Sequence, residues 1–201
     1  EAKVEIPRER LAEIREWVEE KNPVWHAEEY FAKQIMGMTI FKRLVALSTI
    51  STVNPINCLI LGDPATGKSE IGLAFQDVTP NTQYAWGSKL TQAGMTMTTL
   101  GRKISLGMLP RCHMGHVMVD EFNRIPDEDV GAVLASMQHG FFGVEKAWLK
   151  VERVPSRAPI TAMANPYPEY FKGADVHTVK SQIPIQSAAL LTRFHFILII
   201  L

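Results

Sequence analysis

The stretch that most constrains the fold of this chain is a glycine-containing loop at residues 62–69, which reads GDPATGKS. It follows an apolar run at residues 58–61 and precedes residues 70–75, whose composition is typical of the start of a helix. A strand, a glycine loop and a helix in this order are what a phosphate-binding loop requires. The alternative is a glycine turn that binds nothing, and the strand before the loop and the helix after it argue against that alternative.

The residue types in this loop suit a nucleoside triphosphate. Gly62 and Gly67 allow the backbone to curl so that successive N–H groups point at a phosphate oxygen, and a helix starting near Lys68 adds the positive end of its dipole. Lys68 supplies a full charge to the outer phosphates, and the Ser69 hydroxyl can bind magnesium. The residues that we expect to bind the nucleotide and its Mg²⁺ ion are Gly62, Asp63, Pro64, Ala65, Thr66, Gly67, Lys68 and Ser69.

The composition is that of a globular domain. Of 201 residues, 46% are apolar and 21% are charged, which is enough for one well-buried domain or two small ones. Lys plus Arg and Asp plus Glu both number 21, so the overall charge does not point to nucleic acid, although a local basic patch stays open. The N-terminus is charged and the apolar runs are too short to span a membrane, so we expect neither a signal peptide nor an anchor.

The cysteines and the chain ends suggest the setting of the protein. Cys58 and Cys112 lie in or near apolar runs, and we interpret them as reduced core residues of an intracellular protein. The expected location is the cytoplasm or nucleoid, or the nucleus if the source is eukaryotic. The chain begins without Met and stops inside the apolar run 194–201, so we expect a fragment of a longer protein.

Apolar periodicity predicts strands that alternate with helices. We expect helices over residues 7–20, 27–34, 40–48, from 70 onward and 127–138, and strands over 58–61, 81–86, 115–120, 158–164 and 193–201. Residues 88–99 show no clear period, whereas alternating apolar and basic residues over 141–157 predict a β-hairpin. The alternation predicts a three-layer α/β sandwich with a mostly parallel five-stranded sheet and a hairpin insert. We divide the chain into N-terminal helices at 1–50 and the α/β core at 51–201.

Two adjacent acids end the strand expected over 115–120. We expect Asp120 to hold the magnesium shell beside Ser69, and Glu121 to act as the general base that polarises the attacking water in ATP hydrolysis. The alternative is that both acids cap the helix beginning at residue 127 or lie in a solvated turn. The phosphate-binding loop upstream argues against that alternative.

Two further polar residues stand at the ends of expected strands. Asn165 follows the strand expected beside the loop strand, where an amide can contact the γ-phosphate or hold the water. Arg193 opens the last expected strand, where an arginine can reach the nucleotide of a neighbouring subunit. The alternatives are a turn-forming Asn-Pro at 165–166 and a surface arginine paired with a carboxylate.

The order of these motifs resembles that of a known family. GDPATGKS, VDEFNR, AMANP and ALLTRF follow one another as in the AAA+ ATPases, and among these the chain resembles the minichromosome maintenance (MCM) replicative helicases most. Residues 88–96, 104–109 and 35–48 are also similar to the family's segments between the motifs. The resemblance runs from about residue 7 to the end of the chain.

This resemblance implies the P-loop NTPase fold of AAA+ proteins and a hexameric ring that hydrolyses ATP at subunit interfaces to translocate on DNA and unwind it. It implies that Asp120 and Glu121 are the Walker B acids, with Asp120 binding the magnesium ion. It also implies that Lys68 and Glu121 are catalytic together with Asn165 as the sensor-1 residue and Arg193 as an arginine finger acting in trans. The α-helical lid of the family is absent from this chain, so we expect the chain alone to hydrolyse ATP poorly.

The resemblance also implies a DNA-binding surface. Lys146 falls in the family's helix-2 insert, and Lys150, Arg153 or Arg157 lies in the hairpin before the fourth strand. These residues would face single-stranded DNA in the ring channel, because basic residues on a projecting hairpin suit phosphate contact without sequence preference. The alternative is an ordinary solvated hairpin face.

Four residues depart from the MCM pattern. Gly67 replaces the usual Ala before the loop lysine, which should not impair binding. Asn123 and Arg124 replace the usual Asp-Lys and are similar to the MoxR-like remodelling ATPases, while His195 stands where an Asp is common. Two other functions therefore stay open. One is a MoxR- or chelatase-like ATPase that remodels a protein partner, and the other is a degenerate paralogue that only binds nucleotide.

Overall fold

The computed structural model describes residues 7–101, 103–146, 149–185 and 187–201. The helices are α1 (Arg8–Lys21), α2 (Ala27–Tyr30), α3 (Thr39–Ile50), α4 (Lys68–Val78), α5 (Gln92–Met95), α6 (Met108–Arg111), α7 (Asp127–His139), α8 (Val176–Ser181) and α9 (Ala188–Leu191), with short 3-10 turns η1 (Gly87–Lys89) and η2 (Phe122–Arg124). The strands are β1 (Cys58–Gly62), β2 (Thr82–Trp86), β3 (Met97–Leu100), β4 (Lys103–Leu106), β5 (His116–Asp120), β6 (Phe141–Lys146), β7 (Leu149–Pro155), β8 (Ile160–Ala164) and β9 (Phe196–Ile200).

The central sheet has five strands in the order β2-β5-β8-β1-β9, and every neighbouring pair is parallel. The predicted five-stranded sheet is confirmed. Strand β1 lies between β8 and β9, with Leu59 level with Ala162 on one side and Ile197 on the other. Because the strands run the same way, the segments that follow β1, β5 and β8 emerge at one edge of the sheet, where ligands bind in open α/β sheets.

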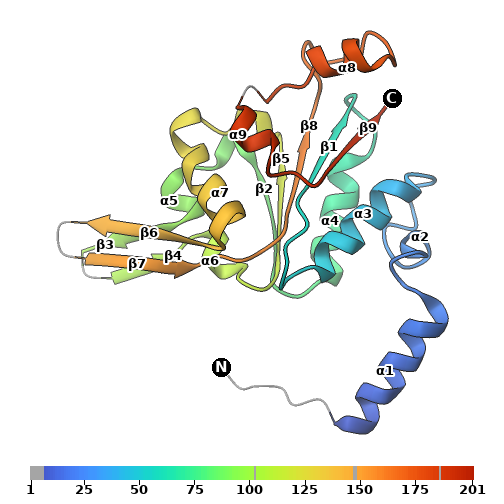
Figure 1. Ribbon diagram of the computed structural model, residues 1–201, viewed down its shortest axis with the longest axis horizontal. Coiled ribbons are helices and arrows are strands. Elements are labelled where there is room, and N and C mark those ends of the chain that lie inside the picture. Colours follow the sequence, from blue (N-terminus) through green and yellow to red (C-terminus); the bar gives the residue numbers. More distant parts are fainter. Residues whose placement is uncertain (1–6, 102, 147–148, 186) are drawn as a thin grey trace.

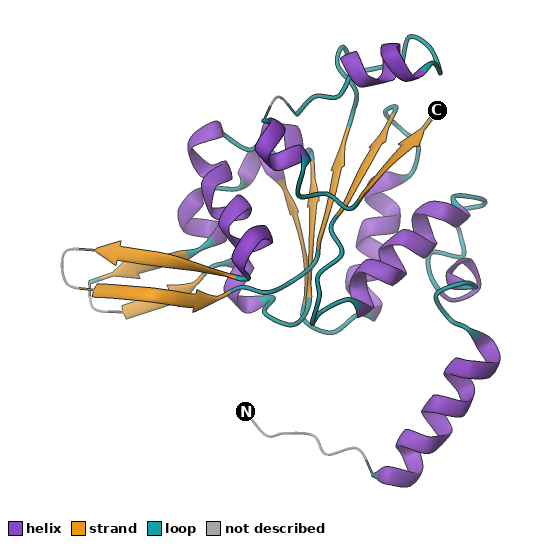
Figure 2. Ribbon diagram, in the orientation of Figure 1, coloured by secondary structure: helices purple, strands orange, loops and turns teal. Residues whose placement is uncertain are grey.

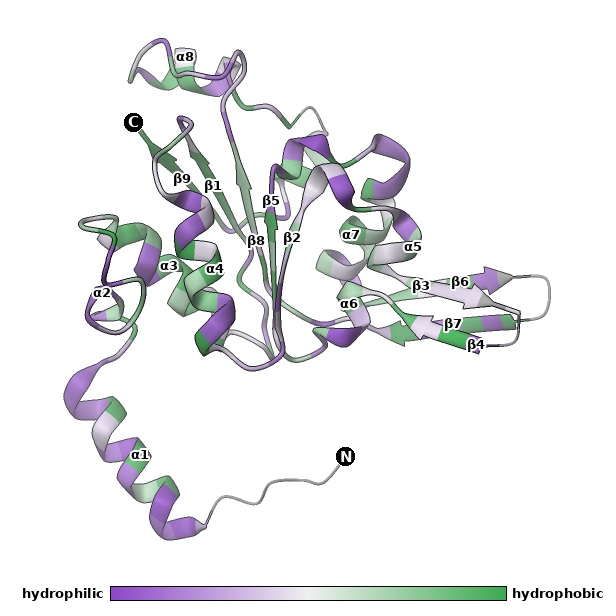
Figure 3. Cartoon of the chain, turned by 180° about the vertical axis from the view of Figure 1, so that it is seen from behind, coloured by the Kyte–Doolittle hydropathy of each residue, from purple (hydrophilic) through white to green (hydrophobic). Residues whose placement is uncertain are grey.

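Helices cover both faces of this sheet, which gives the predicted three layers (Figures 1 and 2). Alternate residues of β1 point to opposite sides. Leu59 and Leu61 belong to the apolar cluster formed with α7 and α9, whereas Cys58 and Ile60 belong to the cluster formed with α3 and α4. Since β1 is buried along its whole length, its continuous apolar run follows from its central place in the sheet. Figure 3 shows the same hydrophobic character in the neighbouring strands.

Both cysteines are buried and free, as predicted for core residues. Burial raises the pKa of the Cys58 thiol to about 12 and that of the Cys112 thiol to about 11. Both thiols therefore stay protonated and pack as small apolar groups.

Two hairpins project side by side from one side of the sheet (Figures 1 and 3). The hairpin β6–β7 is the one predicted over residues 141–157, and its strands are antiparallel with an irregularity between Phe142 and Val144. The hairpin β3–β4 was not predicted, and it begins at the end of the stretch 88–99, which shows no clear period. Each strand of β3–β4 has only four residues, and all of β4 is exposed, so no buried periodicity marks it.

The N-terminal helices differ in part from the prediction. Helix α1 forms as predicted, but none of its residues is buried, and its apolar residues Leu11, Ile14, Trp17 and Val18 are 39–44% exposed. Helix α2 ends at Tyr30 because the chain becomes extended at Phe31, so the helix predicted to residue 34 is too long. Helix α3 shares its core cluster with β1 and α4, while the division at residue 50 stays a prediction. Within the described ranges, the helices lack the length and hydropathy needed to cross a membrane.

Candidate active site

The loop between β1 and α4 has the conformation expected of a phosphate-binding loop. Gly67 has φ 80° and precedes the first residue of α4, so a residue with a Cβ would be strained there. Gly62 plays a different part from the one predicted, because its φ is not positive. A Cβ at Gly62 would lie 3.0 Å from the Ile200 Cβ, so this glycine lets the edge strand β9 approach β1. The curl of the loop thus depends on Gly67.

The Lys68 side chain folds back into this loop. Its Nζ donates hydrogen bonds to the carbonyl oxygens of Gly62 and Asp63, both at 2.7 Å, and to Thr66 Oγ1 at 3.1 Å. Burial lowers the pKa of Lys68, and the nearby charges of Asp120 and Asp63 oppose that shift. Lys68 is 5% exposed, and the three acceptors of its ammonium group carry no full charge. The buried positive charge is therefore available to bind an anion.

The Asp120 carboxylate lies at the end of β5 and is 8% exposed. Its Oδ2 accepts hydrogen bonds from Ser69 Oγ and from Tyr84 Oη, the latter at 2.6 Å, and its Oδ1 accepts from the Glu121 backbone N–H at 2.8 Å. Magnesium prefers oxygen ligands and is held through one or two carboxylates. Since the Ser69 hydroxyl and the Asp120 carboxylate are already in contact, the pair fits one such ion.

Sequence reasoning missed Tyr84, which it assigned only to a strand. Burial, followed by the hydrogen bond to Asp120, raises the pKa of Tyr84 well above its ordinary value, so the phenol stays a donor. The available signal was the pairing of two predicted strands, because β2 lies directly beside β5 and Trp86 is level with Asp120.

The Glu121 side chain is held at the mouth of the site. Its Oε2 accepts a hydrogen bond from Ser88 Oγ at 2.8 Å, and its Oε1 lies 3.3 Å from Arg124 Nη1. Its backbone is in the left-handed region, with φ 49°, which is uncommon for a residue other than glycine and concentrates at functional sites. A Cβ at Gly87 would collide with the Glu121 carbonyl, so Gly87 makes room for this conformation.

A cavity of about 530 Å³ joins these groups. It is lined by Ile35, Pro64, Ala65, Thr66, Gly67, Lys68, Ser69, Glu70, Asp120, Glu121 and Asn165. A second cavity of about 420 Å³ shares Asp120, Glu121 and Asn165 with the first. The structure therefore brings Asn165 and both acids to the loop, at the edge of the sheet where sequence reasoning put them.

Arg193 is not part of this cavity. The prediction that it opens the last strand is wrong, because β9 begins at Phe196 and Arg193 follows α9. It lies near the start of β9, at the end of the sheet opposite the loop, where its carbonyl accepts a hydrogen bond from Asn57 Nδ2 at 3.2 Å. Within the described residues, its buried Nε has no hydrogen-bond partner. His195, which departs from the family pattern, accepts a hydrogen bond at Nδ1 from the Asn57 backbone at 3.0 Å and so helps to fix this turn.

Three of the four basic residues proposed to contact DNA belong to one hairpin. Lys146, which we placed in a separate insert, is the last residue of β6, and Lys150 follows in β7. The Arg153 guanidinium lies 4.8 Å from the centre of the Phe141 ring. Arg157 is beyond the end of β7, so its placement in the hairpin is wrong. It lies at the hairpin base, where its backbone N–H bonds His113 Nδ1.

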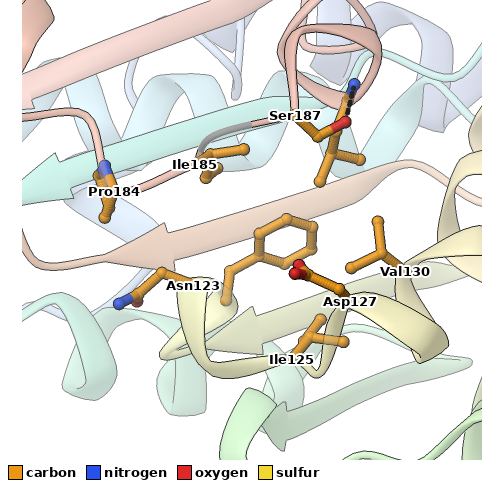
Figure 4. Close-up of a pocket in the computed structure, with 9 residues that line it drawn as sticks. Asn123, Ile125, Asp127, Val130, Pro184, Ile185 and Ser187 are labelled. Atoms are coloured by element: carbon orange, nitrogen blue, oxygen red, sulfur yellow. Dashed lines mark hydrogen bonds between the residues drawn. The ribbon is translucent and has the colours of Figure 1, made fainter.

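A cavity of about 600 Å³ lies away from the loop. Figure 4 shows Asn123, Ile125, Asp127 and Val130 on one side of it and Pro184, Ile185 and Ser187 on the other. Lys and Arg are missing from the described residues that line it, and Asp127 adds a negative charge. It does not suit a triphosphate, so the smaller cavity at the loop is the candidate site.

A parallel sheet with this loop after β1, a buried aspartate at the end of β5 and an amide after β8 defines a P-loop nucleoside triphosphatase domain. The protein-family description that matches the chain is the MCM P-loop domain, over residues 10–201. The chain therefore belongs to the MCM family. Family membership implies that it binds a nucleotide.

Curated relatives agree with this assignment. The chain is 32% identical over 152 residues to a probable DNA helicase MCM8 of Oryza sativa subsp. indica, which covers 73% of this chain and 19% of that protein. It is 27% identical over 186 residues to the maternal DNA replication licensing factor mcm3 of Xenopus laevis, covering 89% and 23% respectively. It is 31% identical over 117 residues to the minichromosome maintenance protein MCM of Saccharolobus solfataricus, covering 55% and 17%. The chain thus spans less than a quarter of the length of these relatives.

Proposed function

We propose that this chain is the ATP-binding and ATP-hydrolysing core of an MCM-like hexameric DNA helicase. The observation that carries the proposal is the convergence of Lys68, Ser69, Asp120, Glu121 and Asn165 on one cavity. A cationic loop, an oxygen pair that suits Mg²⁺ and a second carboxylate are the parts that phosphoryl transfer from ATP to water needs.

Each side chain has a definite task in that reaction. Lys68 and the loop amides bind the phosphates, and Ser69 with Asp120 holds Mg²⁺, which neutralises phosphate charge when bound. Water attacks the γ-phosphorus, the bond to the β–γ bridging oxygen breaks, and ADP leaves with its electron pair. Glu121 takes the proton from the attacking water, while Asn165 orients that water or the γ-phosphate. Ser88 and Arg124 hold the Glu121 carboxylate in place for this step.

We further propose that Arg193 serves the site of a neighbouring subunit. Its position at the far end of the sheet from the loop of its own chain supports this, as does its buried Nε without a partner in the described residues. A guanidinium supplied in trans neutralises charge in the transition state. This arrangement requires a closed ring of subunits, for which a hexamer is our proposal.

Single-stranded DNA in the channel of that ring is the proposed polymer substrate. Lys150 and Arg153 are exposed on the projecting hairpin β6–β7, and Arg157 is exposed at its base. Lys146 is the last residue of β6 in the same hairpin. Cationic side chains presented in this way bind the phosphate backbone without reading bases.

The two alternative functions have less support. The relatives reported above carry the names of MCM proteins or of a DNA helicase, so a protein-remodelling function is not favoured. The complete set of acids around the loop argues against a degenerate paralogue that only binds nucleotide.

The test is ATP turnover by the full-length protein with and without single-stranded DNA, at several salt concentrations. Glu121→Gln should lower turnover at least about 100-fold while ATP still binds, because it removes the base and leaves the loop intact. Lys150→Ala combined with Arg153→Ala should weaken DNA binding and flatten its salt dependence without lowering the affinity for ATP.

Matched controls are available on exposed surfaces. Glu128→Gln on α7 should leave turnover unchanged, and Lys180→Ala on α8 should leave DNA binding unchanged. If Glu121→Gln hydrolyses ATP at the wild-type rate, the assignment of Glu121 as the general base is refuted. A full-length protein that hydrolyses ATP but does not bind single-stranded DNA would refute the helicase function and favour the remodelling alternative.

A further inference from the structure

Tyr84 connects two elements at the point where the candidate cation site lies. Its hydroxyl donates to Asp120 Oδ2 at 2.6 Å, on the same oxygen that accepts from Ser69. The other oxygen of Asp120 accepts from the Glu121 backbone N–H. The Tyr84 hydroxyl and the Glu121 backbone N–H therefore donate to different oxygens of the same carboxylate, which restricts its rotation.

One face of α4 is shaped around Tyr84. Ser69, Gly72 and Gln76 are spaced three and four residues apart, so they share a face of the helix. Ser69 reaches Asp120, and Gln76 Oε1 accepts a hydrogen bond from the Tyr84 backbone N–H at 2.8 Å. The helix thus holds the tyrosine by its backbone while it holds the aspartate by a hydroxyl.

Gly72 makes room for the tyrosine ring. A Cβ at this position would lie 2.7 Å from Tyr84 Cε2 and 3.0 Å from Met163 Cε, which is closer than side chains pack. Glycine inside a helix weakens that helix relative to alanine. The presence of glycine at a buried position of α4 is explained by the space that the ring needs in order to reach Asp120.

We propose that Tyr84 is a positioning residue that orients the Asp120 carboxylate for a divalent cation shared with Ser69. The proposal rests on the proposed function, since it takes Ser69 and Asp120 as the cation ligands. Residues that hold a ligating carboxylate in place raise metal affinity, and their loss typically costs about 10- to 100-fold in that affinity. Tyr84 thereby couples β2 and α4 to the cation without touching the nucleotide.

The experiment measures the affinity of the full-length protein for a fluorescent ATP analogue while Mg²⁺ is titrated from zero. In Tyr84→Phe, which keeps the ring and removes only the hydroxyl, the Mg²⁺ concentration that gives half of the Mg²⁺-dependent tightening should rise about tenfold. Affinity without Mg²⁺ should be unchanged, because Lys68 and the loop are untouched. A role confined to packing would leave both quantities unchanged. The control Tyr30→Phe removes a hydroxyl from α2, which contributes no residue to the lining of the loop cavity, and should change neither quantity.

A second pair of variants tests the same site through Gly72. Gly72→Ala should raise the Mg²⁺ requirement as Tyr84→Phe does, because its Cβ displaces the ring. The matched control is Gly131→Ala in α7, where a Cβ would have no atom within 4 Å. It should leave the Mg²⁺ titration unchanged. Thermal unfolding confirms that each variant is folded before the titration.

The results separate the two levels of the argument. Unchanged Mg²⁺ dependence in folded Tyr84→Phe, together with a large loss in Asp120→Asn, overturns the role of Tyr84 and leaves the proposed cation site standing. A wild-type protein whose ATP affinity does not respond to Mg²⁺, and which is unaffected by Asp120→Asn, overturns the cation site itself and with it the role of Tyr84.

Discussion

Asn57 offers the sharpest test of how the distant parts of this fold are joined. It is 1% exposed, immediately before β1. Its side chain accepts a hydrogen bond from the Ile160 backbone N–H at 3.0 Å and donates one to the Arg193 carbonyl at 3.2 Å. Its backbone exchanges two more with His195, at 3.0 and 2.8 Å. One side chain therefore fastens the starts of β8 and β9 to the start of β1.

The cost of Asn57→Ala follows from what it leaves unpaired. The Ile160 N–H is buried, and losing its partner costs about 2 kcal/mol, while the partly buried Arg193 carbonyl adds about 1 kcal/mol. The expected loss is about 3 kcal/mol in the free energy of unfolding. For a chain of 201 residues, each kcal/mol lowers Tm by about 2–4 °C, so the melting temperature should fall by roughly 9 °C.

Urea unfolding and thermal melting of the 201-residue chain measure this loss. Asn57→Asp places a buried carboxylate oxygen against the Arg193 carbonyl oxygen, so it should be at least as destabilising as Asn57→Ala. Asn54→Ala changes an exposed asparagine in the preceding loop and should stay within about 0.5 kcal/mol of wild type. If Asn57→Ala is as stable as Asn54→Ala, the network does not hold the strands together and this reasoning is refuted.

Two further predictions concern buried ionisable groups. Burial lowers the pKa of His116 from 6.5 to about 3. Below about pH 6.5 the unfolded chain therefore binds a proton at His116 that the folded chain does not. This difference should lower the free energy of unfolding by about 2 kcal/mol between pH 7 and pH 5. Urea titrations at the two pH values should show a smaller loss in His116→Gln than in wild type or in the exposed control His177→Gln, and an equal loss would contradict the buried neutral imidazole. Lys42, 2% exposed, donates from Nζ to the Ile35 carbonyl at 2.7 Å, and Ile35 lines the loop cavity. Lys42→Met should displace Ile35 and weaken ATP binding about fivefold, because the apolar contact of Ile35 with the nucleoside is worth on the order of 1 kcal/mol. Binding of inorganic triphosphate should be unchanged. Equal losses for both ligands, or a similar effect of Lys33→Met at an exposed position, would refute this role.

Some features of the site could be predicted because they depend on local sequence. The strand before the loop, the left-handed Gly67 and the start of α4 at Lys68 are fixed by neighbouring residues, so their pattern is visible in one short stretch. The two acids at the end of β5 and the amide after β8 could be placed at the same edge because parallel strands end together. Buried parallel strands can also be predicted, because they are continuous apolar runs in the sequence.

Other features were hidden because they depend on residues far apart in the chain. Arg193 was predicted to open the last strand because the apolar residues of α9 and β9 lie close together in the sequence. In the structure a turn separates α9 from β9. Phe194 stabilises this turn, since its ring centre lies 5.7 Å from that of Phe122. The hairpin β3–β4 was missed because its strands are short and every residue of β4 is exposed, so no buried face marks it in the sequence.

The sequence by itself determined the loop chemistry, the two acids and the alternation of strands and helices, because each is encoded within about a dozen residues. Only the tertiary structure decided that Tyr84 reaches Asp120, 36 residues away, and that Asn57 holds Arg193, 136 residues away. Both contacts depend on the order of strands in the sheet, which places β2 beside β5 and β9 beside β1. That order follows from how whole layers pack, and neither hydrogen bond leaves a periodic trace in the sequence.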